Sequence, residues 1–199
     1  MAHKIIFLHG FFASGECVPA QALREYFNGK AELLTPDLPL HPYKAIEFMQ
    51  HVCEQEKPDI LIGNSNGSFL TQIIAAKNGI PALLGNPHLK MTDFLKERVG
   101  LHEYKSPRAD GNQQLVIDQA LIDEFEDLQQ HQWDYCTPDN QERIWGLFGD
   151  NDQLAHYEPL FLMHYKHSYH FPGGHTPTAE EVKKYYAPQA EKLYMSFVR

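Results

Sequence analysis

Ser65 lies at the centre of the pentapeptide Gly63-Asn64-Ser65-Asn66-Gly67, which has the pattern G-x-S-x-G. An apolar run, residues 59–62, precedes it, and a helix-like stretch, residues 68–77, follows it. A serine on such a strand-to-helix turn has strained backbone angles and an exposed hydroxyl, and the flanking glycines let strand and helix pass closely. The helix N-terminus also brings backbone N–H groups beside the serine, where they can stabilise an oxyanion. This setting favours Ser65 as a nucleophile.

A serine nucleophile needs a base, and the base needs a group that orients it. Asp152 and His175 each come just after a predicted strand. Because the carboxyl ends of parallel strands meet at one edge of a sheet, we expect these two side chains to lie near Ser65. Their order along the chain, Ser then Asp then His, is the order that accompanies this kind of serine turn. Asp150 is the alternative acid.

The turn after the first predicted strand reads Leu8-His9-Gly10-Phe11-Phe12. A glycine in this turn lets a backbone N–H point at a substrate oxygen, so we expect Phe11 to supply one oxyanion donor and Asn66 the other. Both donors are main-chain groups, and the identity of their side chains matters less. We expect His9 to hold the turn through hydrogen bonds rather than to react.

The side chains of Phe12, His88 and Leu154 follow predicted strand ends, and we assign them to the substrate pocket. A surface position is an equal alternative for His88. Asp37 is interpreted as a turn residue rather than a second catalytic acid.

Six predicted strands alternate with helix-like runs, which is the pattern of a parallel sheet covered on both faces. The strands are expected at residues 4–8, 31–35, 59–63, 81–84, 143–148 and 168–171. We predict an α/β fold, a three-layer doubly wound and mostly parallel sheet with strand order 2-1-3-4-5-6. The whole chain, residues 1–199, is expected to form one domain. Thr178 and Glu181 predict a capping box at the start of the last helix, and Pro188 should kink or split that helix.

Residues 88–141 interrupt this alternation with a long, polar stretch that does not look strand-like. It contains one amphipathic helix with Ile117, Leu121, Phe125 and Leu128 on one face. Because the stretch leaves the carboxyl end of the fourth strand, we expect a helical cap-like insertion over the site.

The composition is that of an ordinary globular protein, with 199 residues, 43% hydrophobic and 22% charged. The formal net charge of −9 disfavours nucleic acid and anionic membranes as partners. No apolar run approaches the length of a membrane span, and the N-terminus has no signal-peptide pattern. The three widely spaced cysteines predict free thiols in a reducing cytoplasm.

The sequence has none of the motifs that hold common cofactors. G-x-G-x-x-G after a strand, a P-loop and H-E-x-x-H are all missing, so no cofactor is implied. His164, His167 and His170 are spaced by three, but they need not share a face, and we predict no metal site.

Four motifs together carry a resemblance to a known family: LHGF at residues 8–11, the serine-bearing turn at 63–67 (hereafter the elbow), GDND at 149–152 and GGH at 173–175. With them the chain resembles serine hydrolases of the α/β-hydrolase superfamily and, more narrowly, the compact YqiA-type bacterial esterases. Outside the insertion the resemblance spans the chain. It implies Ser65 as the nucleophile, His175 as general base and acid, and Asp152 as the group that orients His175. It also implies an oxyanion hole formed by the N–H groups of Phe11 and Asn66.

We therefore expect hydrolysis of a carboxylic ester or thioester, a small-molecule acyl substrate, through an acyl-enzyme. Cleavage of an amide or a C–C bond on the same triad is one alternative. A non-catalytic binding protein on a hydrolase scaffold is another, because fold does not imply function. The two readings differ in whether His175 Nε2 reaches Ser65 Oγ while Asp152 holds the other ring nitrogen. The oligomeric state is open.

Overall fold

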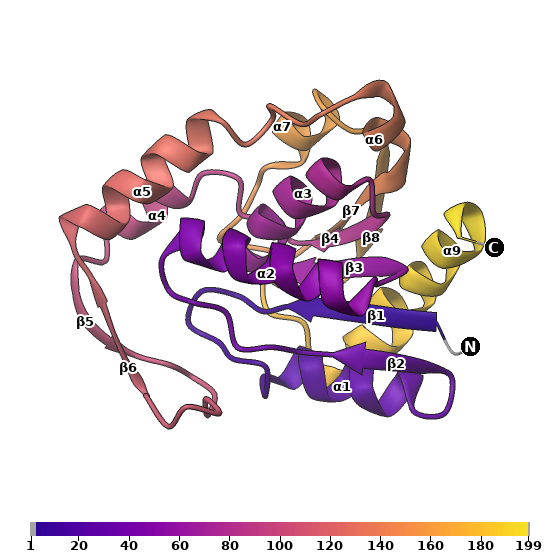
Figure 1. Ribbon diagram of the computed structural model, residues 1–199, viewed down its shortest axis with the longest axis horizontal. Helices are drawn as coiled ribbons and strands as arrows, with labels where there is room; N and C mark the ends of the chain where they lie inside the picture. Colours follow the sequence, from indigo (N-terminus) through magenta and orange to yellow (C-terminus); the bar gives the residue numbers. More distant parts are fainter. Residues whose placement is uncertain (1–2, 199) are drawn as a thin grey trace.

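The computed structural model describes residues 3–198 and has the predicted α/β architecture (Figure 1). Its main sheet has six parallel strands in the order β2-β1-β3-β4-β7-β8, which confirms the predicted order. The strands are β1 (His3–Leu8), β2 (Ala31–Leu34), β3 (Ile60–Asn64), β4 (Ala82–Gly85), β7 (Ile144–Gly149) and β8 (His167–Phe171). The central strands β3, β4 and β7 are continuous apolar runs, because they are buried on both faces, whereas the edge strands β2 and β8 are only partly buried.

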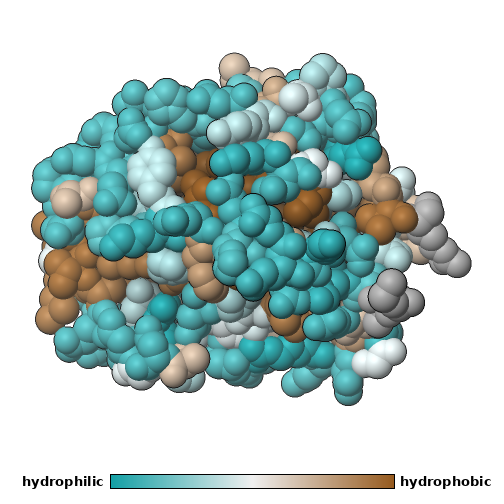
Figure 2. All heavy atoms as spheres, in the orientation of Figure 1, coloured by the Kyte–Doolittle hydropathy of each residue, from teal (hydrophilic) through white to brown (hydrophobic). Residues whose placement is uncertain are grey.

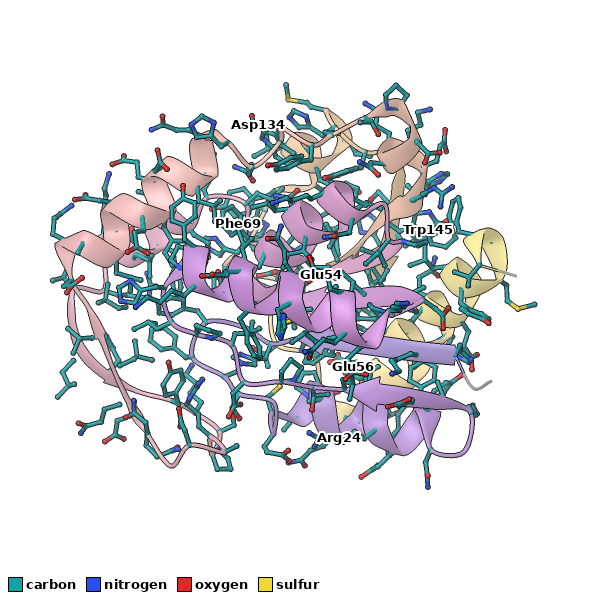
Figure 3. The ribbon with its side chains drawn as sticks, viewed as in Figure 1. Arg24, Glu54, Glu56, Phe69, Asp134 and Trp145 are labelled. Atoms are coloured by element: carbon teal, nitrogen blue, oxygen red, sulfur yellow. The ribbon has the colours of Figure 1, made fainter. Side chains whose placement is uncertain are left out.

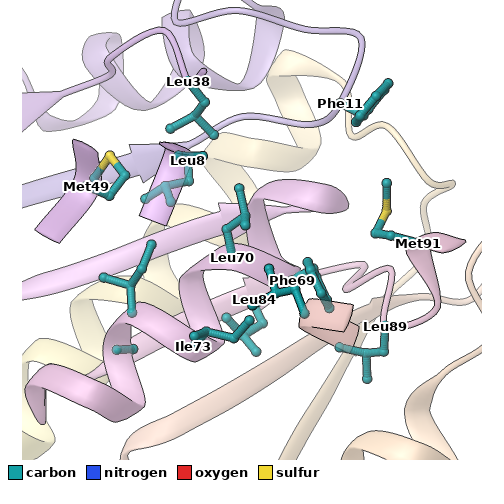
Figure 4. Close-up of a cluster of buried hydrophobic side chains, with 14 of the residues drawn as sticks. Leu8, Phe11, Leu38, Met49, Phe69, Leu70, Ile73, Leu84, Leu89 and Met91 are labelled. Carbon is teal, nitrogen blue, oxygen red and sulfur yellow. The ribbon is translucent and has the colours of Figure 1, made fainter. Parts of the chain in front are cut away.

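Successive side chains of β1 enter two different cores. Ile6 and Leu8 pack in one core, and Ile5 and Phe7 pack in the other. Helices cover both faces of the sheet: α1 (Val18–Phe27) and α9 (Ala187–Phe197) on one side, and α2 (Pro42–Glu56) and α3 (Asn66–Asn78) on the other. Figure 4 shows the core under α3, which extends from the sheet into the insertion.

The last helical segment begins as predicted and is interrupted before Pro188. Thr178 and Glu181 form the capping box at the start of α8 (Ala179–Glu181). A π-helical turn, η1 (Val182–Tyr186), then leads into α9. Proline lacks an N–H and its ring clashes with the carbonyl four residues earlier, and the wider turn avoids both problems.

The insertion between β4 and β7 is not wholly helical, so the expectation that it lacks strands was wrong. It contains α4 (Met91–Lys96), β5 (Gly100–Glu103), β6 (Gln114–Ile117), α5 (Gln119–Gln130) and α6 (Pro138–Arg143). The two strands pair only with each other, antiparallel, as a separate ribbon. A further short helix, α7 (Glu158–Leu162), lies between β7 and β8.

The amphipathic helix of the insertion is α5, with Leu121, Phe125 and Leu128 buried as predicted. Ile117 is also buried, but it belongs to β6. The helix begins after Asp118, whose carboxylate accepts a hydrogen bond from the N–H of Leu121 at 2.9 Å.

The helix α5 packs on α2 and α4. Phe69 of α3 lies in the space between α3 and α5, with its ring 6.1 Å from that of Phe125 (Figure 3). The insertion therefore shares the core of the main domain.

Exposed apolar side chains gather at the end of the molecule formed by the ribbon (Figure 2). They include Val99, Leu101 and Val116. Among residues 3–198, no helix is both long enough and apolar enough to span a membrane.

Candidate active site

Ser65 lies between the end of β3 and the start of α3 with the strained backbone angles φ 56° and ψ −121°. The glycines on either side are required by close packing. A Cβ on Gly67 would lie 2.0 Å from the carbonyl oxygen of Leu8, and one on Gly63 would lie 2.6 Å from Cα of Ser68. The chain can therefore make this sharp turn only with glycine at both positions.

The structure brings the three residues expected to act together into one hydrogen-bonded row. Ser65 Oγ donates to His175 Nε2 over 2.7 Å, and His175 Nδ1 donates to Asp152 Oδ2 over 2.8 Å. This arrangement fixes the imidazole tautomer with its free lone pair toward the serine. The side chains come from three loops at the carboxyl edge of the sheet, after β3, β7 and β8.

The carboxylate of Asp152 is 3% exposed and lies in a ring of donors. Besides His175, the N–H groups of Leu154 and Ala155 donate to its Oδ1 at 2.7 and 3.0 Å. Burial alone would raise the pKa of Asp152, but the imidazole and the two N–H groups outweigh it and hold that pKa below its usual value. The alternative acid, Asp150, instead contacts Nδ1 of His170 at 2.9 Å.

The two N–H groups predicted as oxyanion donors, those of Phe11 and Asn66, are unpaired in the described part of the chain. Asn66 is the first residue of α3, whose N-terminal N–H groups have no partner inside the helix. Gly10 lies against the serine, where an added Cβ would be 3.6 Å from Cβ of Ser65.

His9 holds the turn that carries Phe11. Its Nδ1 donates to the carbonyl of Gly10 at 2.8 Å, and its Nε2 accepts from the N–H of Leu38 at 2.9 Å. Burial lowers the pKa of His9 to about 4, so the ring is neutral and can accept. Asp37 is a loop residue that accepts from the N–H groups of Gly15 and Ala109, both at 2.7 Å.

A cavity of about 610 Å³ opens beside Ser65 and His175. Phe12 and Leu154, which the sequence analysis assigned to the substrate pocket, line this cavity together with Phe11. Its far wall comes from the insertion, through Phe94, Arg98 and the segment 105–107. These insertion residues had no signal in the sequence, because only the tertiary fold brings them to the serine.

His88 does not line this cavity but lies behind it. Its ring is 3% exposed and packs edge-on between Phe94 and Tyr157, each at 5.1 Å between ring centres. The ring of His175 is 6.3 Å away, at nearly a right angle. Burial, followed by the charge of His175, lowers the pKa of His88 to about 4. The surface alternative for His88 is therefore wrong.

Asn86 joins the loops of the site, and the sequence analysis missed it. Its amide nitrogen donates to the carbonyls of Gly174 and His175 at 2.8 and 2.9 Å. Its amide oxygen accepts from the N–H of Gly149 at 2.7 Å. The side chain is fully buried, and its residue has a positive φ of 42°. An asparagine directly after a buried strand and before a proline was the available signal.

The three histidines spaced by three have different partners. His164 stacks on Trp133 at 3.8 Å, His167 contacts Glu142, and His170 contacts the carboxylates of Asp150 and Glu158. In the described part of the chain, no three His, Cys, Asp or Glu side chains form a group that could hold a metal ion.

The sequence profile of the uncharacterised protein family UPF0227 matches residues 4–171. The chain belongs to the UPF0227 family. No curated protein sequence is similar enough to count as a relative.

Solved structures similar to this UPF0227 chain have the α/β-hydrolase fold. Est1E from Butyrivibrio proteoclasticus has a TM-score of 0.71 at 16% identity, over 98% of this chain and 89% of that one. The monoacylglycerol lipase of Paleococcus ferrophilus has a TM-score of 0.70 at 16% identity, over 96% and 94%. Mouse alpha/beta hydrolase domain-containing protein 10 has a TM-score of 0.69 at 13% identity, over 97% and 90%. These likenesses establish the fold as that of the α/β-hydrolases.

Proposed function

We propose that this protein is a serine hydrolase that cleaves a carboxylic ester or thioester through an acyl-enzyme. The observation that carries the proposal is the row Ser65 Oγ, His175 Nε2, His175 Nδ1 and Asp152 Oδ2, with contacts of 2.7 and 2.8 Å. Nucleophile, base and orienting acid are each within hydrogen-bond reach of the next group, as acyl transfer requires. The same contacts speak against a non-catalytic binding protein, which has no need of an activated serine.

In the proposed reaction, His175 takes the proton of Ser65 as the hydroxyl oxygen attacks the carbonyl carbon. The N–H groups of Phe11 and Asn66 stabilise the oxyanion that forms. Asp152 keeps the imidazole in the required tautomer and stabilises the imidazolium. His175 then protonates the leaving group, and in the second half it takes a proton from the water that releases the acyl group. The serine is regenerated, and these side chains and N–H groups suffice without a cofactor.

The insertion, residues 88–141, acts in this proposal as a cap that shapes the acyl-substrate cavity. Phe94 and Arg98 contribute to the wall directly. We place the protein in the cytoplasm, since Cys17, Cys53 and Cys136 are all free thiols.

Labelling with a fluorophosphonate probe tests the proposal, because the probe reacts only with an activated serine. Wild type should be labelled, and Ser65→Ala should lose the label. The control is Ser196→Ala, which removes an exposed hydroxyl of α9 that donates to the carbonyl of Lys192. The kcat for a 4-nitrophenyl ester should fall by roughly 10³-fold or more in Ser65→Ala. Undiminished turnover by folded Ser65→Ala would rule out this nucleophile.

A panel of substrates separates the remaining alternatives on the same site. Faster turnover of esters and thioesters than of matched amides and C–C substrates supports the proposal. The reverse order would assign the triad to amide or C–C bond cleavage.

A further inference from the structure

Three charged side chains line the cavity beside Ser65: Glu16, Arg98 and Lys105. Glu16 is already neutralised, because Arg24 donates to both of its carboxylate oxygens at 2.7 and 2.9 Å. The two cations therefore determine the charge of the cavity wall. This wall is positive although the chain as a whole carries a formal charge of −9.

Arg98 has hydrogen-bonding capacity left for a ligand. Its Nη1 donates to the carbonyl of Phe94 at 2.8 Å and to the carboxylate of Glu97 at 3.1 Å. Within residues 3–198, nothing accepts a hydrogen bond from its Nη2 or Nε. The side chain of Glu97 is 76% exposed, so this ion pair is weak and water competes for it.

The ammonium group of Lys105 also remains available to a ligand. No carboxylate of residues 3–198 lies within 4.0 Å of its ammonium group. Its Nζ lies 5.9 Å from the centre of the Phe12 ring, which itself lines the cavity. The main-chain N–H of Lys105 donates to the carbonyl of Phe12 at 2.8 Å, and this bond fixes the residue at the cavity wall.

An aromatic wall connects the nucleophile with these cations. Gly10 lies beside Ser65, where an added Cβ would be 3.6 Å from Cβ of Ser65, and the next residue, Phe11, packs its ring 6.3 Å from that of Phe94. The guanidinium carbon of Arg98 lies 4.0 Å from the centre of the Phe94 ring. The cavity is thus polar at the serine, apolar along its middle and basic beyond it.

We infer that the cavity binds esters that carry a negatively charged group, such as a carboxylate or a phosphate, separated from the scissile carbonyl by an apolar spacer. This inference rests on the proposed function and specifies its substrate class. The free N–H groups of Arg98 and the ammonium of Lys105 are donors suited to such a group. Phe11, Phe12 and Phe94 accommodate the spacer.

Matched pairs of substrates that differ only in charge test the assignment. One pair carries the difference on the acyl side: the mono-4-nitrophenyl ester of suberic acid and that of its monoamide. The other carries it on the alcohol side: the butyrate esters of 4-hydroxybenzoate and 4-hydroxybenzamide. Wild type should prefer the anionic member of at least one pair by roughly fivefold in kcat/KM. Added salt, about 0.5 M NaCl, should reduce the preference.

The double variant Arg98→Met with Lys105→Met should lose this preference, measured as the ratio of kcat/KM for the anionic and the neutral member of each pair. Lys96→Met is the matched control, since Lys96 pairs with Glu126 and does not line the cavity. That control should keep the preference of wild type.

Equal kcat/KM for both members of both pairs in wild type would overturn the assignment and leave ester hydrolysis standing. A preference that survives in the double variant would overturn it as well. If wild type neither cleaves any of these esters nor reacts with a fluorophosphonate, the proposed function fails, and the assignment fails with it.

Discussion

Asn86 donates a hydrogen bond from its side-chain amide to the main-chain oxygen of His175 over 2.9 Å. The same amide group bonds Gly174 and Gly149, so one buried side chain connects the loops after β4, β7 and β8. Two of these loops carry His175 and Asp152. Asn86 is therefore a positioning residue, which acts on the proposed reaction only through the groups it holds.

Asn86→Asp should lower kcat/KM by roughly 10- to 100-fold, because a carboxylate cannot donate to Gly174 and His175 and small displacements of reacting groups are costly. The acceptor for Gly149 remains. The reaction rate with a fluorophosphonate and the ester kcat/KM measure the effect, and Asn86→Gln reports whether an amide at a longer reach restores any of it.

Asn140→Asp is the matched control for that prediction. Asn140 is also buried, and its amide donates to the carbonyls of Ala76 and Tyr135 at 2.9 and 2.8 Å, away from the site. The control should lose a similar amount of stability and keep kcat/KM. Equal losses of kcat/KM in both variants would mean that Asn86 acts through stability alone.

Asp152→Asn should lower kcat by roughly 10³- to 10⁴-fold, because an amide no longer fixes the tautomer or stabilises the imidazolium. Asp150→Asn is the paired control, since Asp150 contacts His170 instead. It should change kcat less than about threefold. Initial rates on a 4-nitrophenyl ester measure both, and a larger loss in Asp150→Asn would reassign the acid.

His88 should make the free energy of unfolding depend on pH. Its folded pKa is about 4, below the usual 6.5, so the unfolded chain binds more protons between these values. Stability from this group is complete above pH 6.5 and falls as the pH falls toward 4. At pH 5 the loss is about 2 kcal/mol relative to pH 7.5.

Urea unfolding of wild type and His88→Asn at the two pH values checks this. The difference between pH 7.5 and pH 5 should shrink by about 2 kcal/mol in the variant. His156→Asn, which exchanges an exposed imidazole, should keep the wild-type difference. Identical pH dependence in His88→Asn and wild type would contradict the prediction.

Gly67→Ala should destabilise the fold by about 3 kcal/mol or more, because its Cβ would lie 2.0 Å from the carbonyl oxygen of Leu8. Gly29→Ala provides the contrast, since that glycine has a positive φ of 75° but open space around it. It should cost about 1–2 kcal/mol, the strain of the left-handed backbone alone. Urea midpoints compare the two, and a smaller loss for Gly67→Ala would show that the elbow can shift.

The centre of the main sheet was predictable because β3, β4 and β7 are buried on both faces and therefore appear as continuous apolar runs. The edge strands β2 and β8 are only partly buried, and the alternation of strand-like and helix-like runs indicated them. The meeting of Ser65, Asp152 and His175 followed from one rule, that parallel strands end at a common edge. The strands β5 and β6 were not predicted from the sequence, because each has four residues and they pair only with each other. Their short alternating pattern does not stand out from a polar stretch.

The parts of the site that sequence did not predict depend on contacts between distant segments. Asn86 forms hydrogen bonds with Gly149, Gly174 and His175, which lie 63, 88 and 89 positions further along the chain. Arg98 and Lys105 reach the cavity because the insertion folds back over the turn that carries Phe11 and Phe12. No local pattern around either cation indicates that destination.

Hydrogen bonds join the loop between β5 and β6 to the loop after β1. They couple the range of substrates that the cavity admits to the position of the proposed oxyanion donor. Ser14 Oγ lies 2.7 Å from the carbonyl of Pro107, and Lys105 bonds Phe12, next to Phe11, whose N–H we propose as an oxyanion donor. A change in ribbon length or sequence that admits a new substrate also pulls on that donor. In this family, substrate range should therefore diversify through paired changes in the ribbon and in residues 11–14, while the sheet stays constant.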